Sequence, residues 1–242
     1  MRKTIAKHIR KHDDHTLRLF LRRTVSAQLH LLGFILAVAS FSILLYSVLT
    51  STRPDQTSHV IACSIFGLTG ISVFASSALY HFVSDGFLIS DRANSVLNAY
   101  DHFSIYLFIA GTYTAFIVNA IKPPWDTYLL VLVWTLAILG MLYTTYKSRL
   151  PKPLQSRYIS TALFVALGWT LCIRISEAWS VLDSWGKIFL TAGGLSYTIG
   201  AVIYATKKPD PYPPLFGYHE IWHIAVLAGF TFHSLLILRF YL

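Results

Sequence analysis

The chain has 242 residues, of which 55% are hydrophobic and 13% are charged, and its mean hydropathy is +0.55. This composition is too apolar for an ordinary soluble domain and indicates an integral membrane protein. The formal net charge is +9, but much of it lies in one terminal segment, which favours contact with a membrane surface over contact with nucleic acid.

The first element, residues 1–25, is a basic segment. We interpret it as a cytoplasmic anchor against anionic lipid headgroups, and we expect no nucleic-acid partner. The remainder, residues 26–242, is predicted to form one transmembrane helical domain. The basic side chains of the first segment are those of Arg2, Lys3, Lys7, Arg10, Lys11, Arg18, Arg22 and Arg23.

Seven segments of the second part are long and apolar enough to cross a bilayer, for which a helix needs about 20 residues. Short loops join them, so we predict an all-α integral membrane protein with a bundle of seven transmembrane helices. Alternating strands of about ten residues, which are typical of membrane barrels, are absent from the sequence. The predicted spans are roughly 26–49, 59–84, 101–121, 126–146, 158–176, 186–205 and 218–240.

The distribution of positive charge predicts the orientation of these helices. If the N-terminus is cytoplasmic, the cytoplasmic segments carry fifteen of the 20 Lys and Arg residues. Because positive loops stay on the cytoplasmic side, we predict a cytoplasmic N-terminus and an extracytoplasmic C-terminus. The expected location is the plasma (inner) membrane. The two cysteines, Cys63 and Cys172, form no CxxC pair and are predicted to be small buried residues.

Ionisable side chains gather at the predicted cytoplasmic ends of three spans. His81 ends the second span, Asp101 begins the third, and His219 and His223 begin the seventh. The two histidines of the seventh span are four residues apart and project from one helix face. Three imidazoles and a carboxylate are a suitable set for one zinc ion, which would compensate the cost of placing these groups near lipid. His30 enters from the same side.

This set allows two kinds of metal site. If Asp101 binds the ion directly, four protein ligands complete a structural shell; if it holds a water instead, the shell is open and catalytic. Ser77 lies one turn before His81, where its hydroxyl would hold a water or stabilise an oxyanion. Ser77 and Asp101 are therefore the candidate catalytic residues. The alternatives are a packing role for the serine and interfacial histidines bound to headgroups or carbonyls.

The string His219-Glu220-Ile221-Trp222-His223 matches HExxH, the helix motif of zinc proteases. An intramembrane protease of this kind also takes an Asp ligand from another helix. The nearest such string, Leu182-Asp183-Ser184-Trp185-Gly186, is predicted on the opposite face of the membrane. We therefore rank a protease low and expect Glu220 to be an interfacial acid near the positive end of its helix.

Several strings together resemble the haemolysin III branch of the progestin and adipoQ receptor family. The resemblance spans the second to the seventh helix, and it implies zinc held by His81, Asp101, His219 and His223, with Ser77 near the metal. Alkaline ceramidases, which hydrolyse lipid amides, look like distant relatives. The matching strings are Ser77-Ala78-Leu79-Tyr80-His81, Asp101-His102-Phe103-Ser104-Ile105-Tyr106, Ala110-Gly111-Thr112-Tyr113-Thr114, Gly168-Trp169, Gly193-Gly194, Tyr197-Thr198-Ile199-Gly200 and His219 to His223.

The first helix departs from the family pattern, which is Glu-x-x-Asn-x-x-x-His. His30 matches the histidine, but Arg23 and Ser26 occupy the positions of the acid and the amide. Glu220 stands where the family commonly has a small residue.

These features support several functions. The first is a zinc-dependent hydrolase of membrane-lipid amides or esters, or a regulator of membrane lipid homeostasis, with a lipid tail held between helices. The second is a receptor or sensor in which zinc has a structural role. A cytolysin ranks lower, because seven long apolar helices suit a resident membrane protein better than a secreted toxin.

Overall fold

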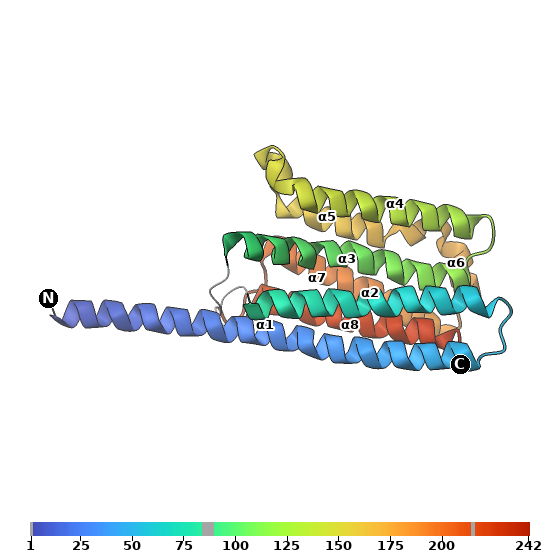
Figure 1. Cartoon of the computed structure of the whole chain (residues 1–242), viewed down its shortest axis with the longest axis horizontal. Helices are drawn as coiled ribbons and strands as arrows, with labels where there is room; N and C mark the ends of the chain where they lie inside the picture. Colours follow the sequence, from blue (N-terminus) through green and yellow to red (C-terminus); the bar gives the residue numbers. More distant parts are fainter. Residues whose placement is uncertain (1, 84–89, 214–215) are drawn as a thin grey trace.

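The computed structural model describes residues 2–83, 90–213 and 216–242, with side chains described from residue 25 onward. Seven segments of this described chain are long and apolar enough to cross a membrane. They form one bundle, in which the helices run roughly along a common axis and the two termini lie at opposite ends (Figure 1). The predicted seven-helix membrane fold is confirmed, and the protein is a multi-pass membrane protein. Its orientation across the membrane stays a prediction.

Eight α-helices and three short 3-10 helices make up the described chain. The fifth predicted span is divided among α5, η3 and α6, and α7 and α8 are the sixth and seventh spans. The elements are α1 (Arg2–Thr50), α2 (Gln56–Val83), α3 (Asp91–Ala120), α4 (Trp125–Tyr146), η1 (Lys147–Arg149), η2 (Lys152–Gln155), α5 (Arg157–Gly168), η3 (Thr170–Arg174), α6 (Ile175–Val181), α7 (Ser184–Thr206) and α8 (Tyr218–Arg239).

Two helices begin ten or more residues before the start that hydropathy predicts. α1 starts at Arg2 and runs without interruption through the predicted boundary at residue 25, and it projects beyond the bundle (Figure 1). The basic side chains of residues 2–23 lie outside the described part. α3 starts at Asp91, where the Ser90 hydroxyl caps it by accepting a hydrogen bond from the Ala93 amide at 3.2 Å. Asp101 therefore lies about three turns inside α3 and not at its first turn.

Reciprocal glycines bring α1 against α2. A Cβ atom at Gly33 of α1 would overlap the ring of Phe74 of α2, and a Cβ at Gly67 of α2 would overlap the ring of Phe41 of α1. Small residues that admit a large neighbour are a common means of close helix packing in membranes. This close approach brings the imidazole of His30 on α1 next to that of His81 on α2.

An aromatic cluster fixes α2, α3 and α8 relative to one another. Phe230 of α8 packs against Phe74, Phe108 and Phe66, with ring centroids 5.1, 5.8 and 6.1 Å away. Such aromatic pairs each contribute about 0.5–1.5 kcal/mol beyond their buried area. The three helices that carry the predicted ligands are therefore held by a rigid apolar core.

The fifth span is not one continuous helix. α5 ends at Gly168, and the chain continues through η3 before α6 begins. Tyr113 of α3 bridges the break, because its hydroxyl donates to the Gly168 carbonyl at 2.7 Å and accepts from the Leu171 amide at 2.9 Å. Irregular backbone inside a membrane requires such partners for its polar groups. Cys172 lies in this break and is exposed, contrary to the prediction, whereas Cys63 is buried as predicted.

Candidate metal centre

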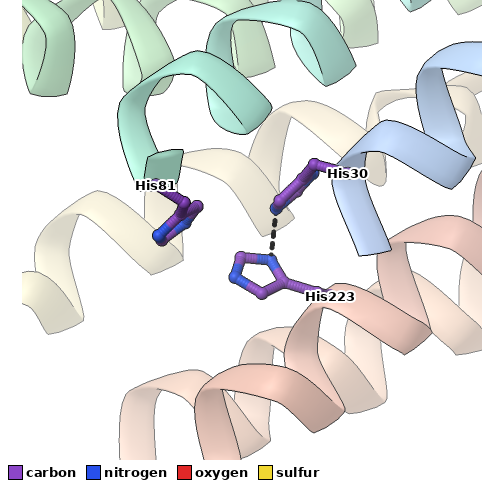
Figure 2. Close-up of side chains that lie close together, drawn as sticks. All are labelled: His30, His81 and His223. Carbon is purple, nitrogen blue, oxygen red and sulfur yellow. Dashed lines mark hydrogen bonds between the residues drawn. The ribbon is translucent and has the colours of Figure 1, made fainter. Parts of the chain in front are cut away.

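Four histidines from three helices converge in the bundle. His30 comes from α1, His81 from the last turn of α2, and His219 and His223 from the first two turns of α8. We call these four residues the histidine cluster. Figure 2 shows His30, His81 and His223 pointing toward one another from their separate helices. His30 and His223 are buried, at 4% and 5% exposure, and His81 is half-buried.

The rings of the cluster are in close contact. Nε2 of His30 and Nδ1 of His223 share a hydrogen bond of 2.7 Å. The ring of His81 stacks on that of His30 with a centroid distance of 5.5 Å, and it meets His223 at 5.0 Å. His219 meets His223 at 4.4 Å and His81 at 5.3 Å.

The geometry of three of these side chains fits a metal ion. His30, His81 and His223 each offer one nitrogen, and these three atoms all lie within 4.8 Å of one another. Imidazole nitrogens bind zinc at about 2.0–2.1 Å, so a small shift of the rings would place one ion between them. A cation would also compensate the burial of several like groups in one place. The identity of the metal stays a prediction.

Asp101 is held by Ser77. The Ser77 hydroxyl donates a hydrogen bond to Oδ1 of Asp101, and both side chains are buried, at 5% and 8% exposure. The serine lies four residues before His81 on α2, so the pair is next to the histidine cluster. Oδ2 of Asp101 lies 3.9 Å from Nδ1 of His102, whose imidazole is hydrogen-bonded to the Asn98 carbonyl at 2.9 Å. The structure therefore brings together the two residues that the sequence analysis named as catalytic candidates.

The predicted ligands occupy different places around the cluster. His81 and His223 belong to the group of three mutually close nitrogens, whereas His219 packs against both rings and Asp101 bonds to Ser77. The sequence had placed His30 only near this cavity. The available signal in the sequence was the position of His30 near the predicted cytoplasmic end of the first span, on the same side as the other histidines. The contact of His30 with His223 depends on how α1 packs on α8, which the sequence does not show.

Glu220 lies in the first turn of α8, near the positive end of its helix as predicted, but its side chain is completely buried within the protein. Its Oε2 accepts a hydrogen bond from the Gly217 amide at 2.8 Å, and its Oε1 accepts one from the Ser26 hydroxyl at 3.0 Å. Both oxygens are thus engaged in capping α8 and joining it to α1. This arrangement gives Glu220 a structural role and disfavours the role of general base in an HExxH protease.

The Asp residue required by a protease also lies far from the cluster. Asp183 caps the start of α7, where Oδ1 accepts from the Gly186 amide at 2.8 Å, and Oδ2 pairs with Arg239 at 2.7 Å. The Arg239 guanidinium and the Gly186 amide lower the pKa of this carboxyl below its ordinary value. Arg239 ends α8, about 30 Å along the helix from His219. The predicted separation of the two strings is therefore present in the structure.

A cavity of about 650 Å³ begins at the histidine cluster and has mostly apolar walls. It extends along α8 from His223 to His233, a distance of about 15 Å. Gly168 of α5 and Gly194 of α7 border it, and a Cβ atom at either position would meet nothing within 4 Å. The volume and the apolar walls suit the hydrocarbon part of a lipid.

Comparisons with known proteins agree with the resemblance noted in the sequence. The family model described as "Haemolysin-III related" matches residues 20–234. "Hemolysin-3" of Bacillus cereus is 30% identical over 202 residues, which are 83% of each chain. "Hemolysin-3 homolog" of Bacillus subtilis is 28% identical over 202 residues, 83% of this chain and 85% of that one. The human "Monocyte to macrophage differentiation factor" is 22% identical over 187 residues, 77% of this chain and 73% of its own.

Proposed function

This chain belongs to the haemolysin-III related family, and on that premise we propose that it is a zinc-dependent hydrolase that cleaves an amide or ester of a membrane lipid. Its site of action would be the plasma membrane, and its partners would be membrane lipids. The proposed zinc ligands are His81, His219, His223 and Asp101, with Ser77 beside them.

One observation carries this proposal. A cluster of imidazoles and a buried Ser77–Asp101 pair lie together at the head of a cavity of about 650 Å³ with mostly apolar walls. The polar head of a lipid would lie at the cluster, and its chain would extend between the helices. A structural metal alone would need neither the serine–carboxylate pair nor the space beside it.

The side chains of the protein have separate roles in this proposal. Zinc, when bound, supplies a Lewis acid that polarises a carbonyl and makes a water molecule more acidic. Asp101 has one oxygen toward Ser77 and a second that is suited to the cation, so it orients the hydroxyl and can accept a proton from it. The hydrogen bond of Ser77 gains strength from its low-dielectric surroundings. The apolar walls hold the acyl chain and keep bulk water away.

Turnover of defined lipids tests the proposal. We expect zinc-loaded wild-type protein in vesicles to release fatty acid from a ceramide or another acyl lipid. Ser77→Ala should lower the rate about 100- to 1,000-fold, as the loss of one transition-state donor does elsewhere, while the zinc content is retained. Ser76→Ala is a matched control, since Ser76 is also buried but bonds to Ser104 at 2.8 Å. Wild-type protein with one zinc per chain and no release of fatty acid would show that the hydrolase proposal is wrong.

A second candidate, a receptor or sensor stabilised by structural zinc, is favoured by the fourth imidazole. His30 lies close enough to join the shell and close it against water. On this account removal of zinc lowers the unfolding temperature, yet neither the wild type nor Ser77→Ala turns over any acyl lipid. The same vesicle assay, combined with thermal unfolding before and after chelation, therefore separates the two functions.

A further inference from the structure

Two buried polar contacts, one helical turn apart, join α1 to α8 beside the candidate metal centre. One is the hydrogen bond between Ser26 and Glu220, and the other is that between His30 and His223. We propose that His30 is a positioning residue for His223 and is not itself a metal ligand. This inference rests on the zinc site of the proposed function and assigns a role to the first helix, which carries none of the proposed ligands.

The distance between the two imidazoles favours positioning over ligation. Nε2 of His30 lies 2.7 Å from Nδ1 of His223. Two nitrogens that bind one tetrahedral zinc ion, each at about 2.0–2.1 Å, are separated by about 3.3 Å. The observed separation is the length of a hydrogen bond, and the two nitrogens would have to move apart by about 0.6 Å to bind the same ion. These two nitrogens therefore share a proton, as the dashed line in Figure 2 indicates.

Metal binding through one nitrogen of His223 would fix the direction of this hydrogen bond. In our proposal His223 presents Nε2 to the metal, which requires that its Nδ1 carry the proton and donate it to Nε2 of His30. Metal-binding histidines generally donate their second N–H to an acceptor in this way, which orients the ring and makes the ligating nitrogen more basic. In many sites a carboxylate or a backbone carbonyl is the acceptor; here a second imidazole occupies that place.

The surroundings of His30 hold its ring in the required orientation. It stacks on His81 with an interplanar angle of 6° and a centroid distance of 5.5 Å, and it packs against Phe74 at 6.1 Å. One turn earlier, Ser26 donates to Glu220 of α8, and both residues are buried. Ser26 and Glu220 stand at positions where this chain departs from the family pattern. Together they set the position of α1 on α8 and thereby the distance between His30 and His223.

Metal binding by His30 variants tests the proposal independently of catalysis. We would measure the number of imidazole ligands by zinc X-ray absorption and the zinc affinity by competition with a chelator. His30→Ala should keep the same number of imidazoles as the wild type, whereas His223→Ala should have one fewer. The affinity of His30→Ala should fall about 10- to 100-fold, the usual effect of losing such a partner. His30→Gln should recover part of this loss, because its amide oxygen can accept the hydrogen bond.

His59→Ala is the matched control, since it removes an imidazole from the same bundle at the end remote from the cluster. It should bind zinc like the wild type. Loss of one imidazole in His30→Ala would make His30 a ligand and overturn the proposal, and so would an unchanged zinc affinity. His30→Gln serves the same comparison if the alanine variant does not fold. If the wild-type protein binds zinc but turns over no lipid, only the proposed hydrolase activity is wrong. If the wild-type protein binds no zinc, both the hydrolase proposal and the proposed role of His30 are wrong.

Discussion

Two polar clusters join helices at opposite ends of the bundle, and they are built differently. At one end is the histidine cluster; at the other the Tyr241 hydroxyl meets Asn119 Nδ2 at 2.8 Å, His59 Nδ1 at 3.1 Å and Cys63 Sγ at 3.4 Å. Arg53 donates to Asn119 at 3.1 Å and lies over the Tyr241 ring. We call Tyr241, Asn119, His59, Cys63 and Arg53 the tyrosine cluster. His59 and His81, one in each cluster, are about 33 Å apart along α2.

The two clusters differ in whether their members provide hydrogen-bond donors and acceptors for one another. The tyrosine cluster combines donors with acceptors, and burial raises the pKa of the Tyr241 phenol, which keeps its proton. The histidine cluster repeats one side chain at the head of a cavity, and three of its members are close enough to hold a shared cation. A mixed network therefore indicates a structural junction, and a set of like ligands beside a cavity indicates a binding site.

The largest expected effect is a difference in zinc binding between variants of the two clusters. His223→Ala should lower zinc affinity at least 100-fold, because it removes both a proposed ligand and the partner of His30. His59→Ala should retain one zinc per chain. Elemental analysis of the two purified variants measures this contrast. Equal zinc contents would mean that the histidine cluster is not the zinc-binding end of the bundle.

The second effect concerns the cavity, which lies beside the histidine cluster and not beside the tyrosine cluster. Gly194→Leu would extend a side chain into space where a Cβ meets no atom within 4 Å. The new side chain would displace a part of the acyl chain about as large as itself. Burial of that much hydrocarbon contributes about 1.5–3 kcal/mol, so its loss should weaken acyl-lipid binding roughly 10- to 100-fold. Zinc content should not change.

Gly193→Leu provides the contrast for that experiment, because its Cβ would overlap the His233 ring. We expect it to lower the unfolding temperature, while Gly194→Leu does not. Lipid binding is measured by displacement of a labelled fatty acid. Unchanged binding in Gly194→Leu would place the ligand elsewhere in the protein.

A third effect should appear in stability alone. Tyr241→Phe removes the hydroxyl that the part-buried Asn119 and His59 contact, and losing such a hydrogen bond costs about 0.5–1.5 kcal/mol. We expect the free energy of unfolding in mixed micelles to fall by this amount, with zinc affinity unchanged. A loss of zinc affinity would mean that the two ends are coupled, and the division into a structural and a binding end would be wrong.

The smallest effect concerns pH at the end that carries the tyrosine cluster. The pKa of Asp183 is lowered by its hydrogen bonds from Arg239 and the Gly186 amide, so its stabilising contribution is present above the ordinary Asp pKa of about 3.9. This contribution is lost as the pH falls through the lower pKa of the folded state. Asp183→Asn should abolish that part of the acid dependence of unfolding. An identical pH profile for the variant would assign the dependence to other carboxyls.

Much of the fold could be predicted from the sequence, because apolar length is a local property. Hydropathy gave the seven spans, and the four-residue spacing gave the shared face of His219 and His223. Hydropathy could not predict the start of α3, since Asp91 to Tyr100 is a largely polar extension stabilised by the Ser90 cap. Nor could it give the break after Gly168, which depends on the hydroxyl of Tyr113 from another helix.

The candidate site divides in the same way. Placing helix ends on one side of a membrane predicted that His81, Asp101, His219 and His223 lie near one another. The burial of Glu220 and the contact of His30 with His223 depend on residues 194 and 193 positions apart in sequence. Such contacts are set by helix packing, for which one sequence carries no local signal.

The most direct measurement is the zinc content and X-ray absorption spectrum of wild-type protein purified without added metal. Our account predicts one zinc per chain with three imidazole nitrogens in its first shell. Protein that is folded and free of zinc, or zinc held without imidazole, would contradict it.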